Sequence, residues 1–136
     1  MKPSEIAKPS AAPESVTVLL AEDEFLIRLD VAEELRRVGW KVIEVSSADE
    51  AIDLLRSSVI VDLVLTDVNM PGQSNGLDLA EFVAREKPNV RVAIMSGHFR
   101  GDAASNVQCD LVIAKPFLHS QLVEKLRPLL EGTEKE

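Results

Sequence analysis

The sequence is poor in cysteine, in cationic side chains and in long apolar runs. Its single cysteine, Cys109, cannot form an internal disulfide. No apolar segment approaches the roughly 20 residues that a membrane-spanning helix needs, and none follows a basic start as in a signal peptide. These absences predict a cytoplasmic protein that does not bind a membrane.

Basic residues are outnumbered, with 15 Lys and Arg against 23 Asp and Glu, so the formal net charge is -8. A molecule of this charge repels nucleic acid and anionic lipid unless one face gathers its cations. Nucleic acid is therefore not an expected partner.

The length of 136 residues and the apolar fraction of 46% are those of one globular domain. Residues 1–15 contain three prolines and no apolar periodicity, so we expect a flexible N-terminal tail. Residues 132–136 form a polar C-terminal tail, and the domain is expected over 16–131.

Short apolar runs rich in Val, Ile and Leu recur along this domain. They are Val16–Ala21, Lys41–Val45, Asp62–Thr66, Arg91–Met95 and Leu111–Ala114. All but the second lack clean alternation, which is typical of parallel strands that are covered on both faces.

Most segments between these runs repeat at helical spacing and have capping residues. The first helix ends at Gly39, the second starts behind Ser46 or Ser47, and Pro88 follows the third. We expect Pro128 to kink or shorten the fifth helix. The fourth segment, 100–107, has little apolar surface, so we expect a short, mobile helix there.

Phe117 and Leu118, which follow the last strand, are expected to anchor the fifth helix in the core. Strict alternation of strands and helices predicts an α/β fold with a doubly wound parallel sheet. Five strands favour the flavodoxin-like (βα)5 form, with strand order 2-1-3-4-5.

Polar residues follow four of the expected strands: Glu22 and Asp23, Asp67, Ser96, and Lys115. In this strand order the first and third strands are neighbours, so the three carboxylates should converge in one crevice. An oxygen-only cluster without His or Cys suits Mg²⁺ or Mn²⁺.

A magnesium site with so few protein ligands suggests that phosphoryl oxygens complete it, and that the chemistry is phosphoryl transfer. Asp67 is then the best-placed nucleophile, while Lys115 and Ser96 are placed to contact phosphoryl oxygens. Taken alone, each residue is more often a helix cap, a turn residue or a solvated side chain. Only their joint placement favours a site.

The segments LLAEDE (19–24), LTDVNMPG (65–72), IMSGH (94–98) and AKPF (114–117) resemble the response-regulator receiver domain family over 16–131. The resemblance implies Mg²⁺ ligands from Glu22, Asp23, Asp67 and the backbone carbonyl of Asn69. It implies that Asp67 accepts a phosphoryl group from a histidine kinase or histidine phosphotransfer protein. Lys115 would contact that group and Ser96 would reorient toward it.

The resemblance also implies a cis peptide between Lys115 and Pro116, and a turn at Gly76 in which glycine can adopt a positive φ. Asn69 and His98 occupy positions that, in the family this chain resembles, tune the lifetime of the phosphate. One departure is Val112, which stands where the family often carries an aromatic switch residue. His119 is expected to be an ordinary surface residue.

The leading hypothesis is a stand-alone receiver, not an enzyme, that promotes only its own phosphorylation and dephosphorylation. The resemblance implies a target-binding face from the fourth helix, the fifth strand and the fifth helix, and it allows a homodimer. A haloacid-dehalogenase-like phosphatase would need an acid where Asn69 stands. A non-switching interaction module and a receiver cut from a longer regulator remain alternatives.

Overall fold

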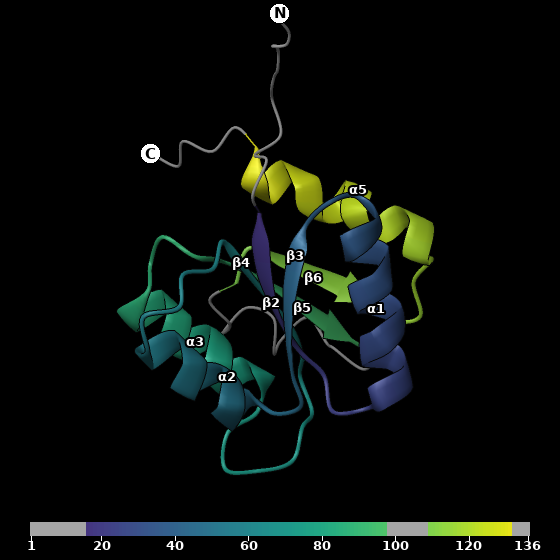
Figure 1. Cartoon of the computed structure of the whole chain (residues 1–136). Helices are drawn as coiled ribbons and strands as arrows, with labels where there is room; N and C mark the ends of the chain where they lie inside the picture. The colour runs from purple at the N-terminus through teal and green to yellow at the C-terminus, as the bar shows by residue number, and fades with distance from the viewer. Residues whose placement is uncertain (1–15, 98–108, 132–136) are drawn as a thin grey trace, which may run out of the picture.

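A computed structural model describes residues 16–97 and 109–131, which form a five-stranded parallel sheet flanked by helices (Figure 1). The strands are β2 (Thr17–Ala21), β3 (Lys41–Val45), β4 (Leu63–Asp67), β5 (Arg91–Ser96) and β6 (Leu111–Ala114). Their order across the sheet is β3-β2-β4-β5-β6, with every neighbouring pair parallel. In chain order this is 2-1-3-4-5, so the predicted fold class is confirmed.

The strands differ from the expected apolar runs by a residue at some ends, and the difference at β4 concerns the site. Asp62 precedes the strand, where its carboxylate accepts a hydrogen bond from the Thr17 N–H at 2.8 Å. Asp67 is the last residue of β4 and pairs in register with Met95 of β5. The Asp67 backbone is therefore held by the sheet and is not part of the following loop.

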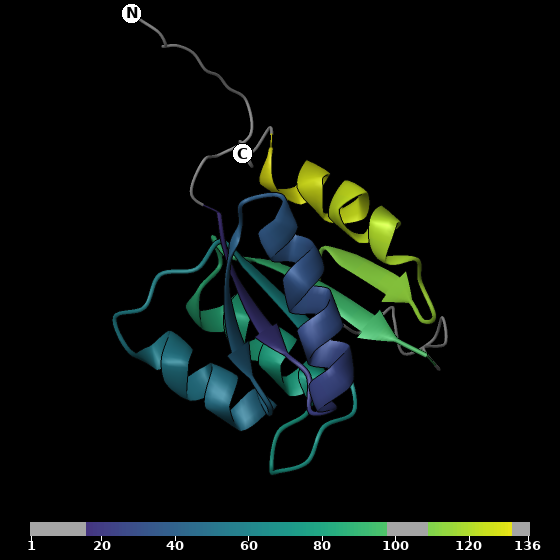
Figure 2. The ribbon, with the colours of Figure 1, turned by 45° about the vertical axis from the view of Figure 1, so that its right-hand side comes forward.

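Helices cover both faces of the sheet, as Figures 1 and 2 show. The helices of the described residues are α1 (Phe25–Arg37), α2 (Ala48–Arg56), α3 (Gly76–Glu86) and α5 (His119–Leu130). One apolar cluster joins α1 and α5 to the sheet, and a second joins α2 and α3 to the opposite face. The runs between strands are apolar on one side because each helix packs on only one face.

The helix boundaries follow local capping chemistry. Ser47, not Ser46, caps α2, because its hydroxyl oxygen accepts a hydrogen bond from the Glu50 N–H at 3.1 Å. Asn75 caps α3 in a reciprocal arrangement with Asp78, a signal that the sequence analysis missed. Gly39 follows α1 with a φ of 93°, as a helix-ending glycine should.

The C-terminal part of the domain departs from expectation at Leu118. Helix α5 continues past Pro128 to Leu130, whose side chain is buried in the core, and a kink at Pro128 stays a prediction. Leu118 is 62% exposed and does not anchor that helix, because it is the extended N-cap residue that precedes the first turn. Phe117 does pack against the core, and so does Trp40.

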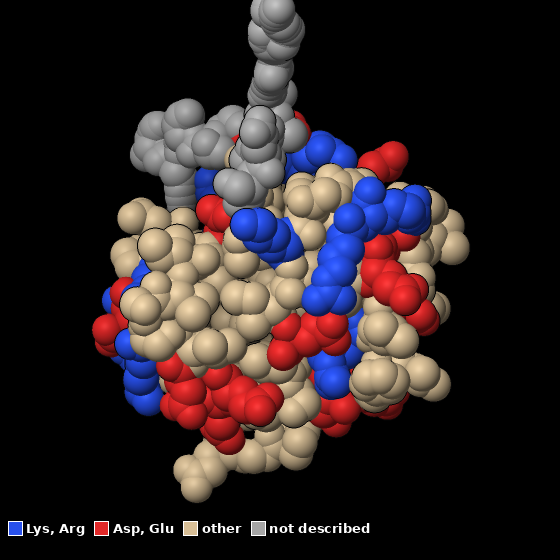
Figure 3. All heavy atoms as spheres, viewed as in Figure 1, with Lys and Arg blue, Asp and Glu red and all other residues tan. Residues whose placement is uncertain are grey.

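Several expectations lie outside the described residues: both tails, the fourth helix at 100–107, and His98. In the part of the chain that is described, helices reach at most 13 residues, and none combines the length and apolar character needed to cross a bilayer. On the face seen in Figure 3, basic and acidic side chains are interspersed, and acidic ones gather over α2, which carries Asp49, Glu50 and Asp53.

Candidate functional site

The carboxyl ends of β2 and β4 bring three carboxylates together. Glu22 and Asp23 follow β2, and Asp67 ends the neighbouring β4. One oxygen from each of the three side chains lies within 4.8 Å of the others. The convergence that the strand order predicts is therefore present.

Glu22 is the most constrained residue of the cluster and is fully buried. Its N–H donates to the carbonyl of Val45 on β3 at 3.1 Å, which continues the pairing of β2 with β3. Its Oε2 accepts from the Glu24 N–H at 3.1 Å, and its Oε1 accepts from Lys115 Nζ at 3.4 Å. These contacts fix the direction of the carboxylate.

Asp67 is half-buried, and its two carboxylate oxygens have different neighbours. Oδ1 accepts a hydrogen bond from the Val68 N–H at 2.8 Å, whereas Oδ2 lies 3.3 Å from Lys115 Nζ. The Thr66 hydroxyl donates to the Asp67 carbonyl at 2.7 Å and fixes the peptide behind the side chain. The carboxylate is thus held on one oxygen and faces a cation on the other.

Lys115 lies between the carboxylates of Glu22 and Asp67. Burial alone would lower its pKa, but the charges of Asp67 and Glu22 and the hydrogen bonds to them outweigh burial, so the pKa of Lys115 is raised. The ammonium is therefore charged at neutral pH. The Lys115–Pro116 peptide is cis, as predicted.

Ser96 and Asn69 lie at the edges of this cluster. Ser96 is buried at the end of β5, and its carbonyl accepts a hydrogen bond from the Lys115 N–H at 2.9 Å, so β5 and β6 set the two residues side by side. Asn69 is exposed, two residues after Asp67. The roles of the Ser96 hydroxyl and the Asn69 carbonyl remain predictions.

The donor set fits a hard divalent cation. Burial and the nearby charge of Asp67 raise the pKa of Glu22, although the Glu24 N–H and Lys115 oppose that rise. The ionised cluster is thus unfavourable by itself and would be neutralised by a bound cation. Carboxylate oxygens are the ligands that Mg²⁺ and Mn²⁺ prefer.

Glycine is required at position 76 because of close packing, and not because of a positive φ as expected. Gly76 is buried and does not have a positive φ; the glycine of this loop that does is Gly72, at 107°. A Cβ on Gly76 would collide with the carbonyl oxygen of Asp67 and lie 2.9 Å from the Val68 Cα. The absent side chain lets α3 start directly against the Asp67 backbone.

Sequence reasoning also missed residues that hold the loops around the site. Asp49 of α2 accepts a hydrogen bond from the Gln73 N–H at 3.0 Å, and Arg28 of α1 donates to the Glu22 carbonyl at 2.8 Å. Arg28 comes five residues after Asp23 in the sequence. Its long side chain can extend back along the first turn of α1 toward the acidic pair, and this spacing was a signal that could have been considered.

Two further residues bear on the expected switch. Val112 lies on β6, partly exposed, and pairs with Ile94 of β5. His119 is exposed at the start of α5 with its ring 6.1 Å from that of Phe117, and it is not part of the carboxylate cluster. The expectation that His119 is a surface residue is confirmed.

A groove of about 430 Å³ opens beside the Lys115 side chain. It lies between α1 and the start of α5 and is lined by Ile27, Val31, Gly97, Lys115, Pro116, Phe117 and His119. Lys115 can therefore be approached from solvent on this side.

Comparison with known proteins agrees with this geometry. The family model for the response regulator receiver domain matches residues 18–127, which include all the residues of the candidate site. A chemotaxis protein CheY homolog of Campylobacter jejuni is 33% identical over 119 residues, covering 83% of this chain and 91% of that protein. The transcriptional regulatory protein PdtaR of Mycobacterium tuberculosis is 36% identical over 109 residues, or 78% of this chain.

Some relatives are longer than the region they share with this chain. It spans 52% of PdtaR and 14% of the sensor kinase CckA of Brucella abortus, which is 30% identical over 134 residues.

Solved structures give the same result. A response regulator receiver protein from Sinorhizobium medicae superposes with a TM-score of 0.79 at 35% identity, covering 86% of this chain and 95% of that one. The response regulator TrrA from Thermotoga maritima, solved in complex with Mg²⁺-BeF, gives a TM-score of 0.76 at 29% identity, covering 85% and 99% of the two chains. The chain belongs to the response regulator receiver domain family of two-component systems.

Proposed function

We propose that this domain is a phosphorylation switch in which Asp67 accepts a phosphoryl group in a Mg²⁺-dependent step. The observation that carries the proposal is the meeting of Glu22, Asp23 and Asp67 with Lys115 at the carboxyl edge of the sheet. A histidine kinase or a histidine phosphotransfer protein would supply the phosphoryl group. The likeness to TrrA, solved with Mg²⁺-BeF, supports the cation.

The metal would be held by the carboxylates of Glu22, Asp23 and Asp67 and the backbone carbonyl of Asn69. Bound there, Mg²⁺ supplies charge neutralisation for the carboxylates and for the phosphoryl oxygens. The Asp67 carboxylate attacks the phosphorus of the donor's phosphohistidine, so that a P–O bond forms, the P–N bond breaks and the imidazole leaves. The product is an acyl phosphate on Asp67.

Other side chains of this site stabilise the product. The Lys115 ammonium, now between Glu22 and Asp67, is placed to pair with a phosphoryl oxygen. The Ser96 hydroxyl donates a hydrogen bond to another of these oxygens. Because Val112 replaces the usual aromatic residue, we propose that the signal passes through Ser96 and the 97–107 segment.

The output that we propose is altered binding of a target protein on the face formed by β6, α5 and the 100–107 segment. A homodimer of the phosphorylated form is a second output that the family allows. The CheY homolog, 91% covered by this chain, supports a stand-alone receiver. We propose that it acts in the cytoplasm. The partial match to PdtaR supports the alternative of a receiver joined to an output domain.

Incubation with acetyl phosphate and Mg²⁺ followed by intact mass spectrometry tests the proposal. We expect one added phosphoryl group on the wild type, and none on Asp67→Asn or in the presence of EDTA. Asp53→Asn, which changes an exposed carboxylate of α2 outside the cluster, is the matched control and should still be labelled. Labelling of Asp67→Asn would place the acceptor elsewhere.

We also propose that the domain is not an enzyme on other substrates. Asn69 stands where a haloacid-dehalogenase-like phosphatase would need an acid to protonate the leaving group. Incubation with a generic phosphate ester and Mg²⁺ should release no phosphate above the level of Asp67→Asn. Turnover that depends on Asp67 would contradict this.

A further inference from the structure

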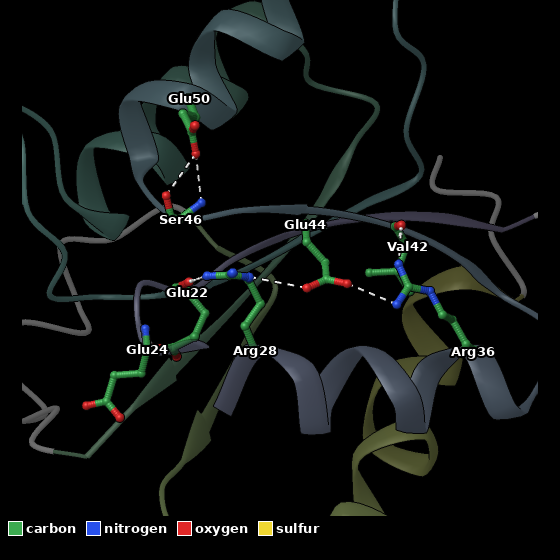
Figure 4. A network of polar contacts seen from close by, with 8 residues as sticks. All are labelled: Glu22, Glu24, Arg28, Arg36, Val42, Glu44, Ser46 and Glu50. Atoms are coloured by element: carbon green, nitrogen blue, oxygen red, sulfur yellow. Dashed lines mark hydrogen bonds and ion pairs between the residues drawn. The ribbon is translucent and has the colours of Figure 1, made fainter. Parts of the chain in front are cut away.

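One side chain of α1 is bonded to the segment that carries the acidic pair. Arg28 NH1 donates to the Glu22 carbonyl at 2.8 Å (Figure 4). The Arg28 backbone N–H donates to the carbonyl of Glu24, the N-cap residue of α1, at 2.9 Å. Both carbonyls that flank Asp23 along the chain therefore accept hydrogen bonds from the same residue. The segment is tied to α1 on each side of Asp23.

The guanidinium is itself held in place. Arg28 Nε donates to Glu44 Oε1 at 3.2 Å, and Glu44 Oε2 accepts from Arg36 NH1 at 2.9 Å (Figure 4). Arg36 NH2 also donates to the Val42 carbonyl at 3.0 Å, and the Phe25 ring lies 5.5 Å from the Arg28 guanidinium carbon. The Arg28 side chain is only 16% exposed, so it links α1, the edge strand β3 and the acidic segment.

The hydrogen bonds of Arg28 oppose the electrostatic repulsion among the three carboxylates. Three carboxylates within 4.8 Å of one another repel, and the repulsion favours movement of the short 22–24 segment away from Asp67. A side chain that fixes the Glu22 peptide resists this movement before any cation arrives. The Glu24 N–H donates to the Glu22 carboxylate, and the Val45 carbonyl accepts from the Glu22 N–H, so these two bonds do not hold the Glu22 carbonyl, which Arg28 does.

We infer that Arg28 is a positioning residue of the acidic site, which holds Glu22 and Asp23 in the arrangement that a divalent cation requires. The inference rests on the proposed function, since it concerns the same Mg²⁺ site. Arg28 does not touch the cation; it acts through the Glu22 carbonyl. Glu44 and Arg36 support it from the side of β3.

The charge of Arg28 alone predicts the opposite effect on Mg²⁺ affinity. A cation beside a Mg²⁺ site repels the metal, so removal of Arg28 should tighten Mg²⁺ binding if only its charge matters. Loss of positioning should weaken binding. Arg28→Lys separates the two effects further, because it keeps the charge but loses the planar fork that donates to two acceptors at once.

The test measures Mg²⁺ affinity by isothermal titration calorimetry without a phosphoryl donor, on wild type, Arg28→Ala, Arg28→Lys and Arg37→Ala. We expect about tenfold weaker binding in both Arg28 variants, the lower end of the effect of removing a group that orients metal ligands. Arg37 is the matched control, because it is on the same helix but pairs with Glu34 away from the site. Its loss should change affinity by about twofold at most at physiological salt.

A second measurement excludes a purely structural role. In acetyl phosphate labelling, the Mg²⁺ concentration for half-maximal rate should rise about tenfold in Arg28→Lys, while the rate at saturating Mg²⁺ stays near that of wild type. If Arg28→Ala does not fold, Arg28→Lys and Glu44→Gln provide the comparison. Unchanged or tighter Mg²⁺ binding in the folded Arg28 variants would overturn the inference. Absence of Mg²⁺ binding by the wild type would overturn the proposed function instead.

Discussion

Substitution of Gly76 by alanine tests whether α3 starts directly against the Asp67 backbone. The new Cβ would meet the carbonyl oxygen of Asp67 and come within 2.9 Å of the Asp67 carbonyl carbon and the Val68 Cα. These are backbone atoms at the end of β4, which cannot move aside as the end of a flexible side chain can. The Gly76 N–H also donates to the Val68 carbonyl at 2.8 Å, so the two segments cannot separate without losing that bond.

The expected cost follows from overpacking. Forcing an extra methyl group into a packed site costs about 1–3 kcal/mol, and backbone neighbours on several sides place this case near the upper end. A Gly-to-Ala change recovers about 0.4–1 kcal/mol through the unfolded chain. The net loss is about 2 kcal/mol, which for a domain of this size lowers Tm by roughly 8 °C.

Thermal unfolding by circular dichroism measures the stability, and acetyl phosphate labelling measures the site. We expect the Gly76→Ala variant to melt lower and to be labelled more slowly, because the shifted backbone moves the Asp67 carboxylate away from Lys115. Gly97→Ala is the matched control, since within residues 16–97 and 109–131 its Cβ would meet only the Lys115 Cβ, at an ordinary 3.9 Å. The free energy of unfolding of Gly97→Ala should differ from that of the wild type by no more than about 0.5 kcal/mol. If Gly76→Ala and Gly97→Ala had the same Tm, the close packing of Gly76 on the Asp67 backbone would be refuted as a cause of instability.

Further predictions concern Glu22 and two helix ends. Burial raises the pKa of Glu22, so the stability that its protonated form contributes is present below the ordinary value of 4.5 and is lost as pH rises through the raised pKa. In EDTA, Glu22→Gln should therefore melt above wild type at pH 7, with the difference shrinking toward pH 4.5, while Mg²⁺ should stabilise only the wild type. A lower Tm for Glu22→Gln in EDTA at pH 7 would contradict this. Asn75→Ala should lose about 1 kcal/mol in urea unfolding through loss of the α3 cap, whereas Ser74→Ala, just before the cap, should change little. Pro128→Ala should raise Tm, because it restores a backbone donor inside α5; an unchanged Tm would indicate that the last turn already frays.

The sheet and the carboxylate cluster could be predicted from the sequence because both follow from general rules. Buried apolar runs that lack alternation indicated parallel strands, and the order of such strands brings the ends of the first and third together. The predicted convergence of three carboxylates, those of Glu22, Asp23 and Asp67, is therefore confirmed. The cis peptide before Pro116 came from family resemblance alone, without a physical argument from the residues.

The contacts that hold the cluster could not be predicted, because they depend on distances between elements. Nothing local marks Gly76 as a site of close backbone approach, and its expected positive φ is found at Gly72 instead. Leu118 was misassigned because an apolar residue beside a core residue can still point outward when it precedes the first helical turn. Arg28 and Glu44 come from different elements, and only the fold brings them together.

Hydrogen bonds hold the loop after Asp67 on the side of α2 and α3. Asp49 bonds the Gln73 N–H on the side of α2, and Gly76 bonds the Val68 carbonyl at the start of α3. On the opposite side, Gly97 is exposed, and among the residues that the structure describes the nearest atom to a Cβ there would be the Lys115 Cβ at 3.9 Å. If a phosphoryl group is added to the Asp67 carboxylate, as we propose, these hydrogen bonds would resist displacement of the loop toward α2 and α3. The bonding of this loop would then restrict the direction in which the domain responds.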